Sequence, residues 1–321
     1  FWLKPSRLFE AGPCPTPREQ RRASPTRPRH RLRGASTMGI DVGGGLLAGG
    51  AFAVSITLHF CVFGGTFFGG KVGGIYLSAG WASTYITPDV GTTLWMWLLC
   101  MLGDLVFVVC LFVPLVGPMS EILYKKSVGL TVYWRVAIAY LLHSAWIMFY
   151  TAEYYIVSLF FIGGHVVVLA SLHMTINMAT VQSAGGYLMF AAPIAFKTAW
   201  VSVVGCVNFF MVWAEYGHVY FKLAGPTELT VVCIVGLAAV SCCVSVVNFE
   251  PLWPTVYAFV FWGILRVPMT LEQGDYKVHA ALMVGVTWAS INAVVSFGLV
   301  VYGACSPAPV VYSPADPRLL A

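Results

Sequence analysis

The chain has 321 residues, of which 59% are hydrophobic and 10% are charged, whereas about 25% of residues are charged in soluble domains. This composition excludes an ordinary soluble globular protein. The formal net charge of +5 arises in residues 1–37, which hold nine of the 18 basic side chains. The remainder is slightly acidic, so we expect no nucleic-acid partner.

Residues 1–37 differ in composition from all that follows. They contain six prolines and no apolar run, and the first plausible initiator is Met38. We interpret this basic, proline-rich leader as untranslated sequence. Two alternatives remain open: an organelle targeting segment, which would be rich in arginine and poor in acidic residues, and a disordered tail.

Eight apolar stretches follow the leader and determine the fold class. A hydrocarbon layer of about 30 Å needs roughly 20 apolar residues in a helix, and backbone groups in lipid must be paired within their own segment. We therefore predict an all-α, polytopic integral membrane helix bundle. It forms one domain over 38–303 with a short tail, 304–321. The expected helices cover about 44–64, 92–115, 133–150, 153–178, 187–213, 228–248, 252–267 and 279–303.

The connections between these helices are short, which makes most neighbours antiparallel. A very short turn at Thr151-Ala152 joins the third and fourth helices, and Pro254 and Pro268 bound the short seventh helix. Lysine and arginine are spread evenly over the two sides, so the positive-inside rule gives no orientation. We expect a multi-pass protein in a membrane that the sequence does not identify, an organellar one being plausible.

Two charged residues lie inside the predicted spans, where charge is costly and usually functional. Asp104 is midway along the second helix and Lys197 is ten residues into the fifth. They could form a mutual ion pair, or they could line a path for a ligand or protons. Alternatively, Lys197 reaches toward the membrane surface and Asp104 binds a water in a cavity.

Histidines are another kind of ionisable group inside the predicted spans. His143, His165 and His173 could bind a metal or a tetrapyrrole iron, but hydrogen bonding between helices is the more common role of such residues. We predict no metal site. No nucleophile–base pair, metal cluster or carboxylate pair occurs at an informative spacing, so we do not expect an enzyme.

Three short motifs in the first five predicted helices recur in a known family of membrane proteins. Residues 87–97 place Thr-Pro before Trp-Met-Trp, which is similar to a proline-then-aromatic helix entry. Residues 141–149, LLHSAWIMF, are similar to a family run of leucine, asparagine, tryptophan and phenylalanine. Pro193, Trp200 and Asn208 match a third series at compatible spacing. Together they resemble the tryptophan-rich sensory protein (translocator protein) family.

The longer relatives in that family add three helices to a five-helix core. Residues 257–264, YAFVFWGI, are similar to a motif of this extension. The resemblance therefore implies a five-helix core over about 44–213 and an extension over about 228–303. It also implies binding of tetrapyrroles or sterols in a groove among the five core helices.

The resemblance supplies candidate binding residues. The groove-lining side chains would be those of Trp97, Trp146, Phe149, Pro193 and Trp200. These aromatic residues suit a flat, mostly apolar ligand, and packing in the core or at the membrane interface is their alternative role.

The chain also departs from the family pattern. His143 occupies the position of the family asparagine, and we include it among the candidates. Thr93 replaces a phenylalanine, and the tyrosine beside Pro193 is absent.

Three functions follow from these observations. The first is binding or transport of a hydrophobic small molecule, a tetrapyrrole, sterol or other isoprenoid, although no cofactor is certain. The second is an ion-coupled secondary transporter that uses Lys197 and Asp104. The third is a structural accessory subunit of an organellar membrane complex, where a homo-oligomer or a complex partner would be expected besides the lipid bilayer.

Overall fold

The computed structural model describes residues 42–63, 88–112, 122–127, 129–177, 184–213, 216, 226–248, 250–266 and 276–305. The predicted leader, residues 1–37, lies outside the described residues, as does the predicted tail from residue 306 onward. The main helices are α1 (Val42–Phe63), α3 (Val90–Leu111), α5 (Val132–Thr151), α6 (Tyr155–Thr175), α9 (Ala192–Val212), α11 (Pro226–Asn248), α12 (Leu252–Leu265) and α13 (Tyr276–Cys305).

Each of the eight predicted stretches is a helix in the structure, which confirms the all-α membrane bundle. Within the described residues, seven helices are long and apolar enough to cross a membrane, and α12, with 14 residues, is a shorter apolar helix. The helix ends differ from the predicted ones by a few residues. The turn between α5 and α6 occupies residues 152–154, slightly later than predicted, and Glu153 there has a positive φ of 65°.

The fifth predicted helix is not uniformly α-helical. A short α8 segment (Ala184–Gly186) leads into a π-helical turn, η1 (Tyr187–Ala191), which continues directly into α9. Pro193 lies in the first turn of α9, where its missing N–H removes one possible hydrogen bond to the preceding turn. π-helical turns often occur at functional sites, and this one precedes the most buried helix of the bundle.

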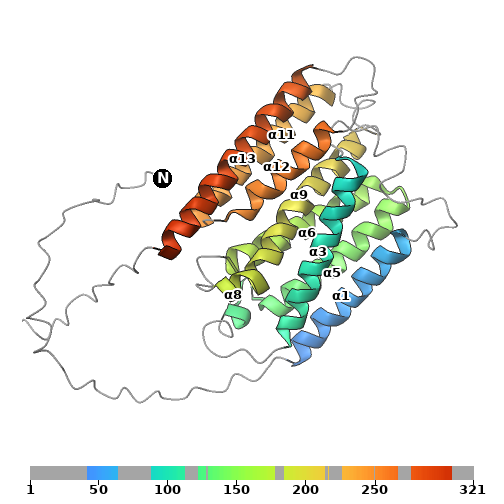
Figure 1. Ribbon diagram of the computed structural model, residues 1–321. Helices are drawn as coiled ribbons and strands as arrows, with labels where there is room; N and C mark the ends of the chain where they lie inside the picture. The colour runs from blue at the N-terminus through green and yellow to red at the C-terminus, as the bar shows by residue number, and fades with distance from the viewer. Residues whose placement is uncertain are drawn as a thin grey trace, which may run out of the picture. The chain divides into compact units, whose positions relative to one another are not determined.

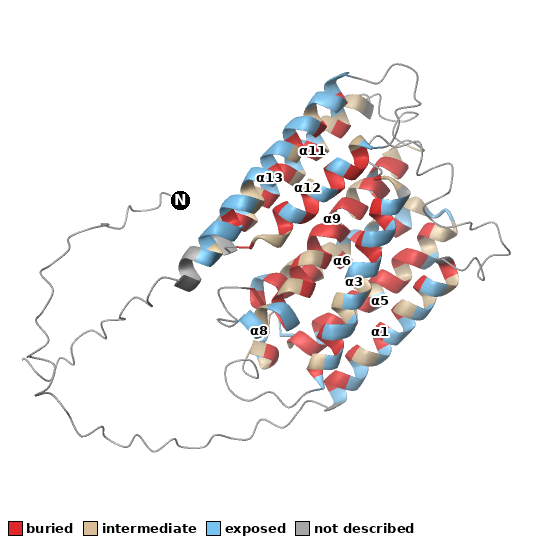
Figure 2. Cartoon of the chain, viewed as in Figure 1, coloured by how far each residue is buried: buried red, intermediate tan, exposed pale blue. Residues whose placement is uncertain are grey.

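In the described residues, helices α1, α3, α5, α6 and α9 form a core, and helices α11, α12 and α13 form an extension beside α9 (Figure 1). In the core, α5 packs against α1 and α6, while α9 packs against α6 and α3. In the extension, α12 packs against α13 and α11, and it also contacts α9. Figure 2 shows buried residues along most of α9 and a largely exposed α13. The exposed valine, leucine and phenylalanine side chains of the outer helices are those that a lipid bilayer would cover.

Polar contacts attach the start of α3 to the end of α12. The carboxylate of Asp89 caps α3 by accepting hydrogen bonds from the N–H of Thr92 at 3.0 Å and from its hydroxyl at 2.7 Å. The N–H of Asp89 donates to the carbonyl of Gly263 at 3.2 Å. A Cβ at Gly263 would lie 2.5 Å from Oγ1 of Thr92, so only glycine allows this approach.

A second polar attachment joins the core to the connection between α11 and α12. The fully buried Glu250 accepts hydrogen bonds from the hydroxyl of Tyr187 at 2.5 Å and from the N–H of Leu252 at 3.1 Å. Burial raises the pKa of Glu250 to about 7, and these two hydrogen bonds act in the opposite direction. The protonation state of this carboxyl therefore changes near neutral pH.

Candidate functional site

The centre of the five-helix core is a cluster of aromatic and imidazole rings. Each of the five core helices contributes at least one ring, and all of them are buried. We call this set the ring cluster; its members are His59 on α1, Trp97 on α3, His143 and Trp146 on α5, His165 on α6 and Trp200 on α9.

The rings of the cluster are arranged mainly in parallel. Trp97 stacks on His143 with centroids 5.3 Å apart and planes 9° apart, and His143 stacks on Trp146 at 5.6 Å and 11°. His165 continues the stack on His143 at 5.3 Å and 17°. Trp200 meets Trp97 edge-on, at 5.8 Å and 84°. Offset and edge-to-face contacts of this kind are the favourable geometries for aromatic pairs.

The polar atoms of the cluster are only partly satisfied. Nδ1 of His143 lies 3.0 Å from the hydroxyl of Ser55 on α1. Within the described residues, Nε2 of His143 and the indole nitrogens of Trp146 and Trp200 are buried without a hydrogen-bond partner. Buried polar atoms without partners are rare, so these three atoms could pair with a ligand.

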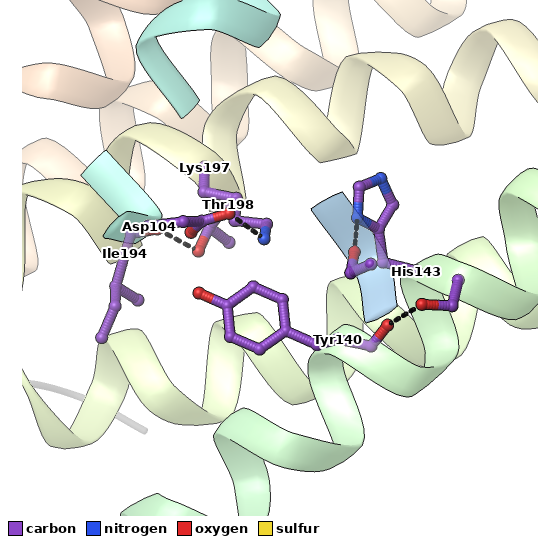
Figure 3. A network of polar contacts seen from close by, with 8 residues as sticks. Asp104, Tyr140, His143, Ile194, Lys197 and Thr198 are labelled. Carbon is purple, nitrogen blue, oxygen red and sulfur yellow. Dashed lines mark hydrogen bonds and ion pairs between the residues drawn. The ribbon is translucent and has the colours of Figure 1, made fainter. Parts of the chain in front are cut away.

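A buried ion pair lies beside the ring cluster (Figure 3). Nζ of Lys197 donates to Oδ2 of Asp104 at 2.6 Å, and the two side chains are 3% and 13% exposed. Nζ also lies 4.3 Å from the ring centroid of Tyr140, a cation–π contact. Of the arrangements predicted for Asp104 and Lys197, the structure therefore adopts the mutual ion pair.

Two small cavities flank this ion pair. One, of about 20 Å³, is bounded by α3, α5, α6 and α9, and Lys197 and Pro193 line it. The other, of about 10 Å³, lies between α1, α3 and α5, with His59 and His143 in its wall. Asp104 lines both. Each has room for about one water molecule, and neither could hold a tetrapyrrole or a sterol in this conformation.

The predicted site residues do not all meet. Trp97, Trp146, Trp200 and His143 belong to the ring cluster, and Pro193 lines the larger cavity. Phe149 lies apart from them.

Phe149 is only partly buried and stacks on Phe161 of α6, with centroids 5.2 Å apart and planes 6° apart. Its closest aromatic neighbours thus lie on the α6 side of the bundle. The third candidate histidine, His173, is also remote, because its ring packs against Trp253 of α12 at 5.7 Å.

Three site residues were missed in the sequence. Ser55 of α1 is the hydrogen-bond partner of His143, and His59 of α1 belongs to the ring cluster. Tyr140 of α5 makes the cation–π contact with Lys197. His59 offered a weak signal, as a histidine inside an apolar helix. Within the described part of the chain, no group of three histidine, cysteine, aspartate or glutamate side chains is placed to hold a metal ion.

The fold and the site together define a multi-pass membrane helix bundle with an aromatic centre and a buried ion pair beside it. A family model described as TSPO-like protein matches residues 46–302, a range that covers nearly all of the core and the extension, from within α1 to within α13. The chain therefore belongs to the TSPO-like protein family, and the family resemblance inferred from the short motifs is confirmed. No curated protein and no solved structure matches the chain.

Proposed function

We propose that this TSPO-like membrane protein binds or moves a hydrophobic small molecule, with the ring cluster as its site. The ligand classes are a tetrapyrrole, a sterol or another isoprenoid. The proposal is for a binding or transport protein and not for an enzyme. The observation that carries it is the ring cluster itself, in which, among the described residues, Nε2 of His143 and the indole nitrogens of Trp146 and Trp200 are buried without a hydrogen-bond partner.

The chemistry of the cluster supports a flat ligand. Parallel rings of Trp97, His143 and Trp146 present apolar faces, against which a planar or fused-ring molecule would stack. Nε2 of His143 and the indole N–H groups of Trp146 and Trp200 would then pair with its polar substituents. Ligand sites commonly combine an apolar lining with a few polar groups of this kind.

Binding requires the core to open, because the present cavities hold only about one water each. We place the opening between α1 and α3. The smaller cavity lies there, and α1 packs mainly on α5 and less on α3. Separation of α1 from α3 would expose His59 and Trp97, whose ring centroids are 4.7 Å apart.

The test is a ligand titration of the purified full chain with protoporphyrin and, separately, with a sterol, followed by tryptophan quenching. Trp146→Leu and Trp200→Leu each remove one aromatic contact, worth roughly 0.5–1.5 kcal/mol, and should weaken binding about 2- to 12-fold. Trp134→Leu is the matched control, because Trp134 is on α5 but 49% exposed. Thermal unfolding of each variant checks that the fold is intact.

Saturable quenching that the two core substitutions weaken and the control does not would support the proposal. Quenching that never saturates, or that all three variants weaken equally, would contradict it.

A second candidate function, ion-coupled secondary transport, is favoured by one specific observation. The pair of Asp104 and Lys197 lies inside the membrane-length helices α3 and α9, beside two water-sized cavities that Asp104 lines in both cases. Exchange of a proton or cation at this pair could be linked to opening of the core.

The measurement is ligand flux into proteoliposomes with and without a pH gradient. Asp104→Asn should abolish the dependence on the gradient under this mechanism. Flux in the variant that still follows the gradient would exclude it.

A further inference from the structure

A large groove lies outside the core, between α11 and α13. Its volume is about 670 Å³, and its walls include Ala238, Ala239 and Cys243 of α11 and Ala280, Val284 and Trp288 of α13. Ligand pockets of proteins commonly measure about 300–1,000 Å³. This groove is therefore large enough for a single small molecule, unlike the two cavities of the core.

The groove results from small side chains on two helices that touch closely at one point. Gly285 allows the contact, because a Cβ at this position would lie 3.1 Å from Cγ2 of Ile234 on α11. Beside that point alanines of the two helices line the space between them, and they leave the hollow unfilled.

The walls of the groove are almost entirely apolar. Among the described residues, no charged side chain and no hydroxyl group lines it, and the hydrogen-bonding side chains of its wall are two cysteine thiols and the indole of Trp288. A ligand with carboxylates, such as a tetrapyrrole, would find no partner here. This lining suits an uncharged molecule that is mostly hydrocarbon and carries very few polar atoms.

Trp288 is the unusual member of this wall. It lies midway along the span Tyr276–Val301 and is 48% exposed, whereas tryptophans of membrane proteins concentrate at the two interfaces, where the indole N–H meets water or headgroups. Within the described residues, the Trp288 side chain makes no hydrogen bond, and the side-chain amide of Asn292 donates to its backbone carbonyl at 3.0 Å. A donor at this depth needs an acceptor that also reaches the middle of the bilayer.

We propose that the groove between α11 and α13 binds one isoprenoid lipid whose carbonyl oxygen accepts a hydrogen bond from the indole N–H of Trp288. This site goes beyond the proposed function, because it lies in the extension and uses none of the core residues. An isoprenoid ketone or quinone dissolves in the hydrocarbon layer and can bring its carbonyl to the depth of Trp288.

Two other occupants fit less well. The ester carbonyls of a phospholipid stay at the interface, about 15 Å from the middle of a hydrocarbon layer of about 30 Å, so they cannot reach Trp288. A helix from a second copy of the chain could fill the groove, but most of its backbone carbonyls are paired within the helix, so it offers the indole N–H few acceptors at this depth.

The experiment is photolabelling of the full chain in phosphatidylcholine vesicles with a diazirine-bearing polyprenyl ketone, followed by peptide mapping. Val284→Trp fills the groove, and Val294→Trp is the matched control on the same helix, because the two valines are 68% and 72% exposed and only Val284 lines the groove. Trp288→Phe keeps an aromatic ring and removes the donor.

The proposal expects saturable labelling of α11 and α13 that unlabelled ketone displaces. Val284→Trp should abolish this labelling and Val294→Trp should leave it unchanged. Trp288→Phe should weaken ketone binding about tenfold, the change expected for loss of one buried hydrogen bond.

Three results would overturn the proposal. Labelling that is unsaturable, or that a photoreactive phosphatidylcholine reproduces, would indicate bulk lipid. Labelling that is equal in Trp288→Phe would exclude the hydrogen bond. Oxidative cross-linking of Cys243 between copies, together with absent labelling, would assign the groove to a second copy.

Protoporphyrin titration of Val284→Trp separates this test from that of the core. If the ring cluster is the protoporphyrin site, Val284→Trp should bind protoporphyrin as the wild type does. Loss of ketone labelling in the groove would then leave the result for the ring cluster unaffected.

Discussion

Removal of one partner from the buried ion pair should destabilise the bundle more than removal of both. At the observed separation of 2.6 Å between Lys197 and Asp104, the Coulomb attraction is about 6 kcal/mol at an effective dielectric constant of 20. Much of this offsets the cost of taking both charges out of water. Asp104→Asn leaves Lys197, whose side chain is 3% exposed, without its counter-charge, and should lower the free energy of unfolding by roughly 3–5 kcal/mol.

The double variant Asp104→Leu/Lys197→Met tests the reasoning. It removes both charges and replaces them with apolar groups of similar volume, a change that is often neutral or stabilising in protein interiors. We expect its free energy of unfolding to lie within about 1 kcal/mol of the wild-type value. The two single variants, Asp104→Leu and Lys197→Met, complete a double-mutant cycle.

The assay is reversible unfolding in mixed micelles with increasing SDS, monitored by far-ultraviolet circular dichroism. A large coupling energy, with the double variant more stable than either single variant, is the expected outcome. Strictly additive losses, or single variants that lose less than about 1 kcal/mol, would refute the view that each charge stabilises the other.

Three further predictions concern contacts between helices. Glu250 has its pKa raised by burial to about 7, so wild-type stability should fall as the pH rises from about 4.5 through 7, by about 3 kcal/mol in all. Glu250→Gln should flatten this dependence in thermal unfolding measured across that pH range. Gly263→Ala forces a Cβ against Thr92 and should cost about 1–3 kcal/mol, whereas Gly236→Ala, with open space around it, should change the melting temperature little. Ser158→Ala removes a hydrogen bond of 2.8 Å from α6 to α9 and should cost only about 0.6 kcal/mol in SDS unfolding.

The helices could be predicted from the sequence because the length of an apolar stretch is a local property. The charged pair could be anticipated for a related reason. Asp104 and Lys197 are conspicuous in apolar surroundings, and both lie well inside their spans. Their pairing in the structure at 2.6 Å needed only that the second and fifth helices be neighbours.

The ring cluster could be predicted only in part, because helices that are apolar on all faces do not reveal which face points inward. Trp146 and Phe149 are three residues apart on α5, yet Trp146 faces the cluster while Phe149 stacks on Phe161 of α6. Tyr140 gave no sign of its role and His59 gave only a weak one, because each meets its partners across a helix interface. The rotation of each helix about its axis was the information that the sequence lacked.

The short helix α12 has a consequence for the surrounding bilayer. Its 14 residues extend about 21 Å at 1.5 Å per residue, roughly 9 Å less than the average hydrocarbon thickness. Phe259 and Trp262 face outward from α12. The hydrophobic surface that the helix offers to neighbouring lipids is therefore shorter than the thickness of their hydrocarbon layer. Thinning of the bilayer there costs a fraction of a kcal/mol per Å. The cost falls in thin membranes, and hydrophobic mismatch at one helix therefore biases where in the cell the whole protein is most stable.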